Sequence, residues 1–119
     1  MGCKIEKQNV IVDKSFYFTL SIIELYKYPV KVKKEYVLSK QLLRTGTSVG
    51  ANIRDAVVTQ SKKEFIAKMN ISLKEIHECQ YWLQLLSKSG FIINEQCLEN
   101  EVNELIKIIT AIIKTSNEN

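Results

Sequence analysis

Apolar side chains recur every three to four residues along most of this chain, which is the spacing that places them on one face of an α-helix. Over residues 15–28 two such stripes run side by side, so this segment is apolar on more than one face. The stripes are Phe18, Ile22 and Leu25, and Phe16, Leu20 and Ile23. Pro29 is expected to end this first helix, because proline lacks a backbone donor and disfavours helix in the residue before it.

A second helical pattern runs from about residue 34 to residue 58. Gly46 and Gly50 lie inside it, where each costs up to about 1 kcal/mol relative to alanine. We expect a close contact with another helix to be the reason for both glycines. The inward stripe of this helix is predicted to be Leu38, Leu42, Thr45, Val49, Ile53 and Ala56.

The third helix has signals at both of its ends. Ser61-Lys62-Lys63-Glu64 has the form of a capping box, in which the serine accepts from the Glu64 amide and the glutamate reaches back to the serine. Ser89-Gly90 supplies a left-handed stop. The inward stripe is predicted to be Phe65, Met69, Leu73, Ile76, Leu83 and Leu86.

The fourth helix is expected to begin after Asn94, which has a suitable cap side chain, with Glu95 in the first turn where the helix dipole favours an anion. Its apolar arc is broad, so it covers more than one neighbouring helix. The inward stripe is Val102, Leu105, Ile109 and Ile112, widened by Ile106, Ile108 and Ile113.

Four amphipathic helices with short connections predict an all-α fold, the antiparallel up-down-up-down four-helix bundle, because each stripe is covered only by its neighbours. The composition agrees, since 119 residues with four glycines and one proline are typical of one helical domain. We expect residues 1–12 to be a flexible arm and residues 13–119 to be the single bundle domain. The first and fourth helices carry more apolar surface than one seam requires, which favours a homo-oligomer.

The cysteines and the apolar stretches indicate a compartment. Three cysteines cannot all pair internally, and no secretory leader pattern opens the sequence, so a reducing, cytoplasmic setting is favoured. Charges interrupt every apolar stretch before the roughly 20 residues of a membrane helix, so we expect no membrane span. Cys79 and Cys97 are predicted to be buried thiols, whereas Cys3 lies in the arm, where exposure alone would make it reactive.

The charge is unevenly distributed although the net charge is only +4. Residues 1–63 carry 12 Lys or Arg and 5 Asp or Glu, a net +7, and residues 64–119 carry 5 and 8, a net −3. Two interpretations stay open: solvated loop lysines, or a surface for phosphates or an acidic partner. The candidate nucleic-acid-binding residues are Lys27, Lys31, Lys33, Lys34, Arg54, Lys62 and Lys63.

Polar residues form a regular stripe along the second helix. If the second and third helices fold back near Gln60 and Ser61, Arg44 faces Glu75 and Glu78. The same register would set Ser48 against Ser72, Asn52 against Lys68, and Gln41 against Cys79. An arginine with carboxylate acceptors in a partly buried seam makes charge-assisted hydrogen bonds. We interpret the set as a structural network that fixes register, with ligand binding as the alternative. Its members are Gln41, Arg44, Ser48, Asn52, Asp55, Glu75 and Glu78.

No catalytic, metal or cofactor site is expected. A bundle di-metal site needs Glu-x-x-His motifs on two helices, but the chain has one histidine, and Lys74 stands three residues before His77. We expect His77 to be a solvated surface residue. Neither a phosphate-binding glycine loop nor a nucleophile elbow is present, so an enzyme is not expected. The aromatic residues are interpreted as core and interface packing, with base stacking as the alternative. They include Tyr17, Tyr26, Tyr28, Tyr36, Tyr81 and Trp82.

A set of residues between Phe16 and Ile113 resembles the bacterial four-helix bundle family of 23S rRNA intervening sequence proteins. These residues include Gln41-Leu42-Leu43-Arg44, Ser48, Ala51-Asn52-Ile53, Ser61, Phe65, Lys68, Leu73, Glu75, Glu78 and Trp82-Leu83. The resemblance implies a ring-shaped homopentamer and a relation to the accessory variability protein of diversity-generating retroelements, which has a basic surface and works with nucleic acid. The chain departs from the family pattern at Arg54-Asp55, usually Ala-Glu, and at Ser72, usually Ala.

We therefore expect a non-enzymatic, oligomeric bundle that presents a basic surface to RNA or DNA, as an accessory factor. The alternative is a protein–protein assembly scaffold with no nucleic-acid role. A steep loss of affinity with salt would separate the two, because phosphate contacts release counterions.

Overall fold

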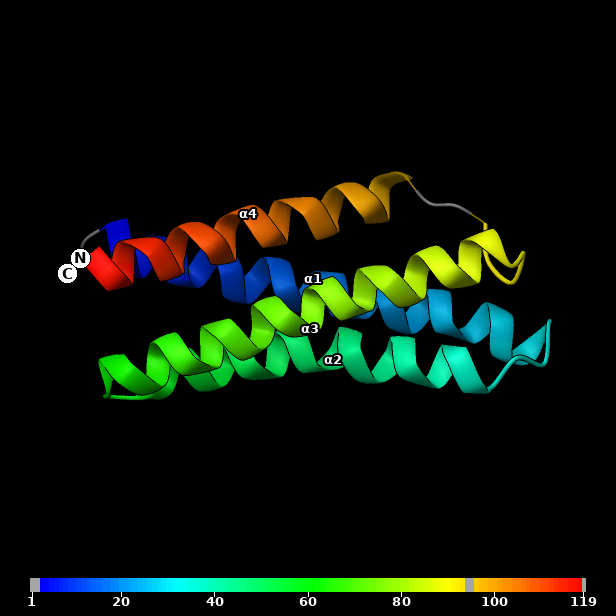
Figure 1. The fold of residues 1–119 in the computed structure, drawn as a ribbon, viewed down its shortest axis with the longest axis horizontal. Helices are drawn as coiled ribbons and strands as arrows, with labels where there is room; N and C mark the ends of the chain where they lie inside the picture. The colour runs from blue at the N-terminus through cyan, green and yellow to red at the C-terminus, as the bar shows by residue number, and fades with distance from the viewer. Residues whose placement is uncertain (1–2, 94–95, 119) are drawn as a thin grey trace.

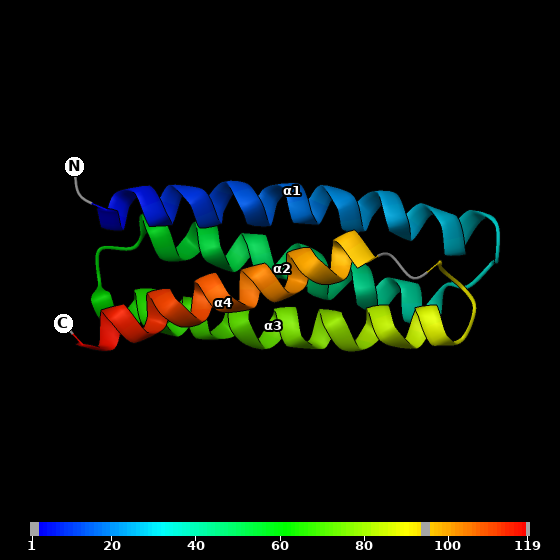
Figure 2. The same ribbon diagram turned by 90° about the horizontal axis from the view of Figure 1, so that it is seen from above.

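The computed structural model describes residues 3–93 and 96–118. Within them the chain forms helices α1 (Cys3–Lys31), α2 (Val37–Val58), α3 (Lys62–Lys88) and α4 (Gln96–Glu118), and no strand. Successive helices run in opposite directions, as the colour sequence in Figures 1 and 2 shows. The predicted all-α four-helix bundle is confirmed.

The four helices form a closed ring of contacts, in which α1 packs on α2 and α4, and α3 packs on α2 and α4. The bundle measures 47 × 22 × 19 Å. The connections α1–α2 and α3–α4 lie at one end, which we call the loop end (Figure 1). The α2–α3 connection, the start of α1 and the end of α4 lie at the other, which we call the hairpin end (Figure 2).

The helix α1 is longer than predicted at both ends. Residues 3–12, expected as a flexible arm, belong to this helix, and Ile11 is fully buried. Ile11 continues the stripe of Phe18 and Ile22 through the small, buried Ser15, so the apolar period extends further toward the N-terminus than the sequence analysis recognised. Pro29 lies inside the helix, two residues before its end at Lys31. Proline lacks the backbone N–H that would donate to the preceding turn, but so close to the end of the helix this loss affects only the last turn.

Most of the predicted inward positions of α2, α3 and α4 are buried. The differences concern Leu38 and Leu73, which are half-buried, while the neighbouring Ser39 and Ser72 are fully buried. Small hydroxyl residues at these positions let the helix backbones approach, and both side chains have an acceptor. The Ser39 hydroxyl donates to the Glu35 carboxylate and the Ser72 hydroxyl to the Val49 carbonyl of α2. The predicted residues that are buried are Leu42, Thr45, Val49, Ile53, Ala56, Phe65, Met69, Ile76, Leu83, Leu86, Val102, Leu105, Ile109 and Ile112.

The two glycines of α2 lie in close contact with α1. A Cβ at Gly46 would be 2.8 Å from Cγ2 of Ile22, and one at Gly50 would be 3.3 Å from Oγ1 of Thr19. The Thr19 hydroxyl donates to the Gly46 carbonyl at 3.2 Å, which joins the two helices at this point. The predicted close helix contact is therefore present, and α1 is the partner.

The capping box at the start of α3 is formed with a different return contact. The Ser61 hydroxyl accepts from the Glu64 amide at 3.2 Å, as predicted. The Glu64 carboxylate, however, accepts from the Thr59 hydroxyl at 2.6 Å instead of reaching the Ser61 amide. Thr59 has an extended backbone that places its hydroxyl within reach of both groups, since the Ser61 amide donates to it at 3.4 Å.

The end of α3 and the start of α2 complete the loop end. Gly90 has the predicted left-handed φ of 82°. The Phe91 amide donates to the Leu86 carbonyl at 2.9 Å, the bond pattern of a Schellman stop. The predicted cap of α4, Asn94 with Glu95, lies outside the described residues. At the start of α2 the carboxylate of Glu35 accepts from the amides of Val37, Leu38 and Ser39 at 2.8, 3.0 and 2.8 Å, a cap the sequence analysis missed.

Candidate functional site

Arg44 is the centre of the polar seam between α2 and α3. Its Nη2 donates to Glu78 Oε1 at 2.7 Å, its Nη1 lies 3.6 Å from Glu75 Oε2, and its Nε donates to Gln41 Oε1 at 3.0 Å. The side chains of Arg44, Glu78 and Glu75 are 51%, 33% and 14% exposed. The guanidinium therefore ties two turns of α3 to α2 at the edge of the core, with one side open to solvent.

At the other levels of the seam the observed contacts are made by residues one or three positions from the predicted partners. The Ser72 hydroxyl donates to the Val49 carbonyl at 2.9 Å instead of facing Ser48. The Asn52 amide turns back along α2 and donates to the Ser48 carbonyl at 2.9 Å and to the Ser48 hydroxyl at 3.0 Å. Lys68 lies 3.7 Å from Asp55 instead of facing Asn52. The residues singled out on α2 thus bond partly within their own helix.

Two buried polar atoms along this seam have no hydrogen-bond partner among the described residues. They are Glu75 Oε2 and the indole nitrogen of Trp82. Arg44 supplies only a charge contact to this Glu75 oxygen, at 3.6 Å. Sequence spacing does not predict either unpaired atom, because the burial of each depends on the distance between the helix backbones.

The two described thiols and the histidine differ in their exposure to solvent. Burial, the largest cause, raises the pKa of the Cys79 thiol to about 12, a hydrogen bond with Thr45 opposes this rise, and the charge of Glu75 adds to it. Cys79 was expected to face Gln41, but it contacts Thr45 instead. Cys97 is exposed, so its predicted burial is wrong, because its side of α4 faces away from the core. His77 is exposed as predicted, and no described cluster of three or more His, Cys, Asp or Glu side chains suits a metal ion. The side chain of Cys3 lies outside the described residues.

The loop end carries the lysines of the α1–α2 connection. Lys27 is offset by Glu24, whose carboxylate is 2.9 Å away. The remaining lysines at this end have no ion pair within the described part of the chain, and all are exposed: Lys31, Lys33, Lys34 and Lys88. Glu35 shares this end, but its carboxylate is engaged with the amides of α2.

The hairpin end is more balanced in charge. Lys14 pairs with Glu104 at 2.7 Å, and Asp55 pairs with Lys68. The guanidinium carbon of Arg54 lies 5.3 Å from the centroid of the Phe16 ring, a cation–π contact with α1. Lys62 and Lys63 are exposed and make no ion pair with another described residue. The three candidate cations at this end, Arg54, Lys62 and Lys63, are therefore all exposed to solvent.

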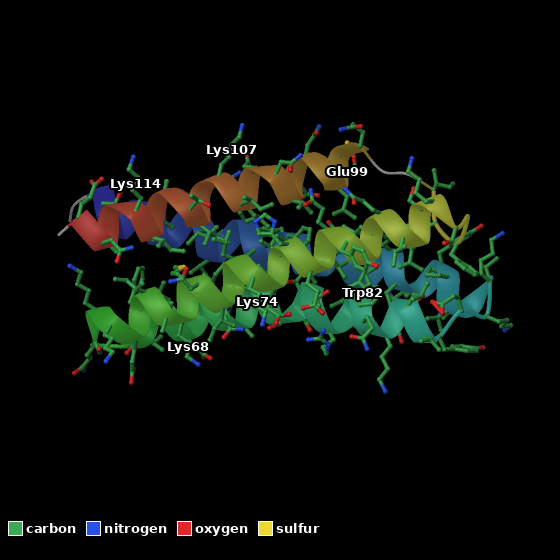
Figure 3. The ribbon with its side chains drawn as sticks, viewed as in Figure 1. Lys68, Lys74, Trp82, Glu99, Lys107 and Lys114 are labelled. Atoms are coloured by element: carbon green, nitrogen blue, oxygen red, sulfur yellow. The ribbon has the colours of Figure 1, made fainter. Side chains whose placement is uncertain are left out.

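Two open grooves mark the surface. The first runs along α1, has a volume of about 570 Å³, and is lined by Tyr17, Leu20, Ser21, Glu24, Leu25, Tyr28 and Ile93. The second lies between the end of α3 and the start of α4, has a volume of about 770 Å³, and is lined by Tyr81, Gln84, Leu85, Ser87, Lys88 and Glu99. We call them the α1 groove and the α3–α4 groove. Figure 3 labels Glu99 near the start of α4. The residues of each groove come from different helices or connections, and sequence spacing does not bring them together.

None of the described helices is long and apolar enough to cross a membrane.

The chain is similar to known proteins over most of its length. A family model described as 23S rRNA-intervening sequence protein matches residues 7–111. A crystal structure from Bacteroides thetaiotaomicron, described as a protein with unknown function from the S23 ribosomal protein family, is 49% identical. The match covers 91% of this chain and 98% of the Bacteroides chain, with a TM-score of 0.87. No curated protein matches the chain. These matches confirm the resemblance seen in the sequence.

Proposed function

This chain belongs to the 23S rRNA-intervening sequence protein family, and from this premise we propose that it is a non-enzymatic bundle that assembles with itself and presents a basic surface to RNA or DNA. The family name associates its members with 23S rRNA, which makes RNA the first partner to test. In this proposal the protein binds its partner without converting a substrate, so it would act as an accessory factor.

The observation that supports nucleic-acid binding most strongly is the group of lysines at the loop end. Lys31, Lys33, Lys34 and Lys88 are exposed and make no ion pair with another described residue. A lysine in an ion pair gives up its carboxylate partner when it binds a phosphate. An unpaired lysine binds the phosphate without this loss. Phosphate contacts of this kind supply most of the sequence-independent affinity for nucleic acid.

Self-assembly is supported by the outward face of α1. Phe16, Tyr17, Leu20 and Tyr28 are 45%, 64%, 42% and 41% exposed, although large apolar side chains on one helix face are usually covered. We assign this face to contacts between subunits of a homopentamer, the assembly that the family resemblance implies. In a ring the loop ends of all subunits would lie around one axis. The electrostatic potentials of their lysines would then add together.

A protein–protein scaffold is the second candidate. The α1 groove favours it, because its lining is mostly aromatic and aliphatic and its one carboxylate, Glu24, is paired with Lys27. A helix of another protein with an apolar face fits such a groove. In that case binding would change little with salt.

The experiment compares three double variants with the same change in net charge. They are Lys31→Glu with Lys33→Glu at the loop end, Lys62→Glu with Lys63→Glu at the hairpin end, and Lys107→Glu with Lys114→Glu on α4, which serves as the control. Figure 3 shows the two control lysines on α4. Binding of a labelled structured RNA and of a random duplex is measured at several salt concentrations. We expect the loop-end variant to lose the most affinity and the control the least. Equal losses in all three would reject a defined basic site.

Assembly is tested by light scattering at micromolar concentration. The wild type should have the mass of an oligomer, and Leu20→Asp should shift it toward the monomer, because the new carboxylate would be buried between subunits. The control is Ile71→Asp, an exposed apolar residue on α3. A monomeric wild type would reject self-assembly through α1.

A further inference from the structure

We infer that the α3–α4 groove binds a base of a single-stranded nucleic acid, with Tyr81 as the stacking platform. This inference rests on the proposed function and assigns it a site. The groove combines an aromatic ring, one cation, two polar side chains and a carboxylate: Tyr81, Lys88, Gln84, Ser87 and Glu99. An aromatic face with nearby hydrogen-bonding groups and a cation is the set that single-stranded nucleic acids require.

Tyr81 is placed to stack. Its side chain is 55% exposed although it lines a groove. The ring lies in a T-shaped contact with Trp82, with centroids 5.2 Å apart and planes at 69°. Trp82 is half-buried against the core, whereas the Tyr81 ring is open to solvent. An exposed aromatic face that also lines a groove has room for a base to stack on it.

The outward side of α3 forms a track without carboxylates that leads into the groove. Residues spaced by three and four positions share this side and are all exposed: Lys74, His77, Tyr81, Gln84 and Lys88. The acidic residues of the same stretch, Glu75 and Glu78, turn instead toward Arg44 on α2. At 1.5 Å per residue the track from Lys74 to Lys88 is about 21 Å long, the length of about six stacked nucleotides. Its last residue, Lys88, is one of the unpaired lysines of the loop end.

Glu99 decides which part of a nucleotide the groove accepts. A carboxylate repels phosphate, so the backbone should follow Lys74 and Lys88 while the base enters the groove. Carboxylates accept hydrogen bonds from exocyclic amino groups, such as N4 of cytosine, whereas uracil offers a carbonyl oxygen at that position. The groove should therefore prefer cytosine to uracil.

The chemistry of this groove favours a nucleic acid over a protein helix. Leu85 is the one aliphatic residue among its described lining residues, whereas the α1 groove has Leu20, Leu25 and Ile93. A helix that docks through an apolar face has more apolar area to bury on α1.

The test uses the full chain and a labelled 12-nucleotide oligocytidylate, with binding followed by fluorescence anisotropy. Tyr81→Ala should weaken binding by about 5- to 150-fold, the range for loss of one base–aromatic stack, with an unchanged salt slope. Tyr81→Phe should stay within about twofold of the wild type, because it keeps the ring. Ile71→Ala, an exposed position on the same helix, is the control and should bind like the wild type.

A second arm tests the base and the backbone. Wild type should bind oligocytidylate more tightly than oligouridylate, and Glu99→Gln should reduce this difference. The oligodeoxycytidylate reports whether the 2′-hydroxyl matters, and binding of either sugar supports a single-strand site. Equal affinity for cytidylate and uridylate would overturn the role of Glu99 in reading the base.

The possible outcomes distinguish a failure of the proposed groove site from a failure of the proposed nucleic-acid binding. If Tyr81→Ala binds as the wild type does while the loop-end variant loses affinity, the groove is wrong and the proposed function stands. If wild type binds structured RNA but no single strand, the inference is overturned alone. If wild type binds neither, both fail.

Discussion

Removal of Arg44 tests the polar seam most sharply, because one guanidinium holds two carboxylates of α3. In Arg44→Ala the Glu78 carboxylate loses a 2.7 Å hydrogen bond, and the 14% exposed Glu75 keeps a buried oxygen with no partner. Breaking a fully buried pair costs about 3 to 5 kcal/mol. Arg44 is 51% exposed, however, and water screens its charges, so we expect a loss of about 1 to 3 kcal/mol.

The assay is urea unfolding at one fixed protein concentration, because subunit association would change the apparent stability. A loss of this size should lower the midpoint without a change in slope. A double-mutant cycle with Glu78→Ala should give a coupling above about 0.5 kcal/mol, since the two groups are in contact. Lys40→Ala, an exposed residue on α2, is the control. If Arg44→Ala unfolds like the wild type, or if the cycle shows no coupling, the seam does not fix the hairpin.

Three further predictions concern other parts of the bundle. Desolvation, the largest single cause, raises the pKa of Glu35, but the amides of Ser39, Leu38 and Val37 and the Ser39 hydroxyl together lower it below its ordinary value of 4.5. The stabilisation from this carboxylate is therefore present above pH 4.5 and is lost as the pH falls through the lower folded pKa. Glu35→Ala should therefore cost about 1 kcal/mol at neutral pH, and urea midpoints should show the difference from wild type vanish in acid. Gly46→Ala should lower the free energy of unfolding by about 1 to 3 kcal/mol in the same assay, because the new Cβ would lie 2.8 Å from the buried, branched Ile22. A variant more stable than the wild type would contradict the close contact. Cys97 should react with a thiol reagent in the folded protein and Cys79 should not, as mass spectrometry would show; modification of both at equal rates would contradict the burial of Cys79.

The sequence predicted those features that depend on helical spacing. The stripe of α2 and the cap at Ser61 follow from positions three and four residues apart, and the pairing of Arg44 with α3 follows from folding the two helices back at Gln60 and Ser61. The left-handed stop at Gly90 follows from the one residue type without a Cβ penalty.

Other features depend on how closely two backbones approach, which spacing does not specify. Ser72 bonds to the Val49 carbonyl because α2 and α3 meet there within hydrogen-bond reach. Glu35 caps α2 from outside the helix, and glutamate is not among the usual cap residues, so its role was not recognised. The α3–α4 groove needs the crossing of two helices to bring Tyr81 and Glu99 to one site.

The proposal that a basic surface of this bundle binds nucleic acid is tested most directly by the salt dependence of wild-type binding to a structured RNA. Each phosphate contact releases counterions, so the logarithm of the affinity should fall linearly with the logarithm of the salt concentration. Replacement of Lys31 and Lys33 by glutamate should make that slope shallower by about one for each lost contact. Binding that is independent of salt, or absent at low salt, would contradict the proposal and favour the protein scaffold.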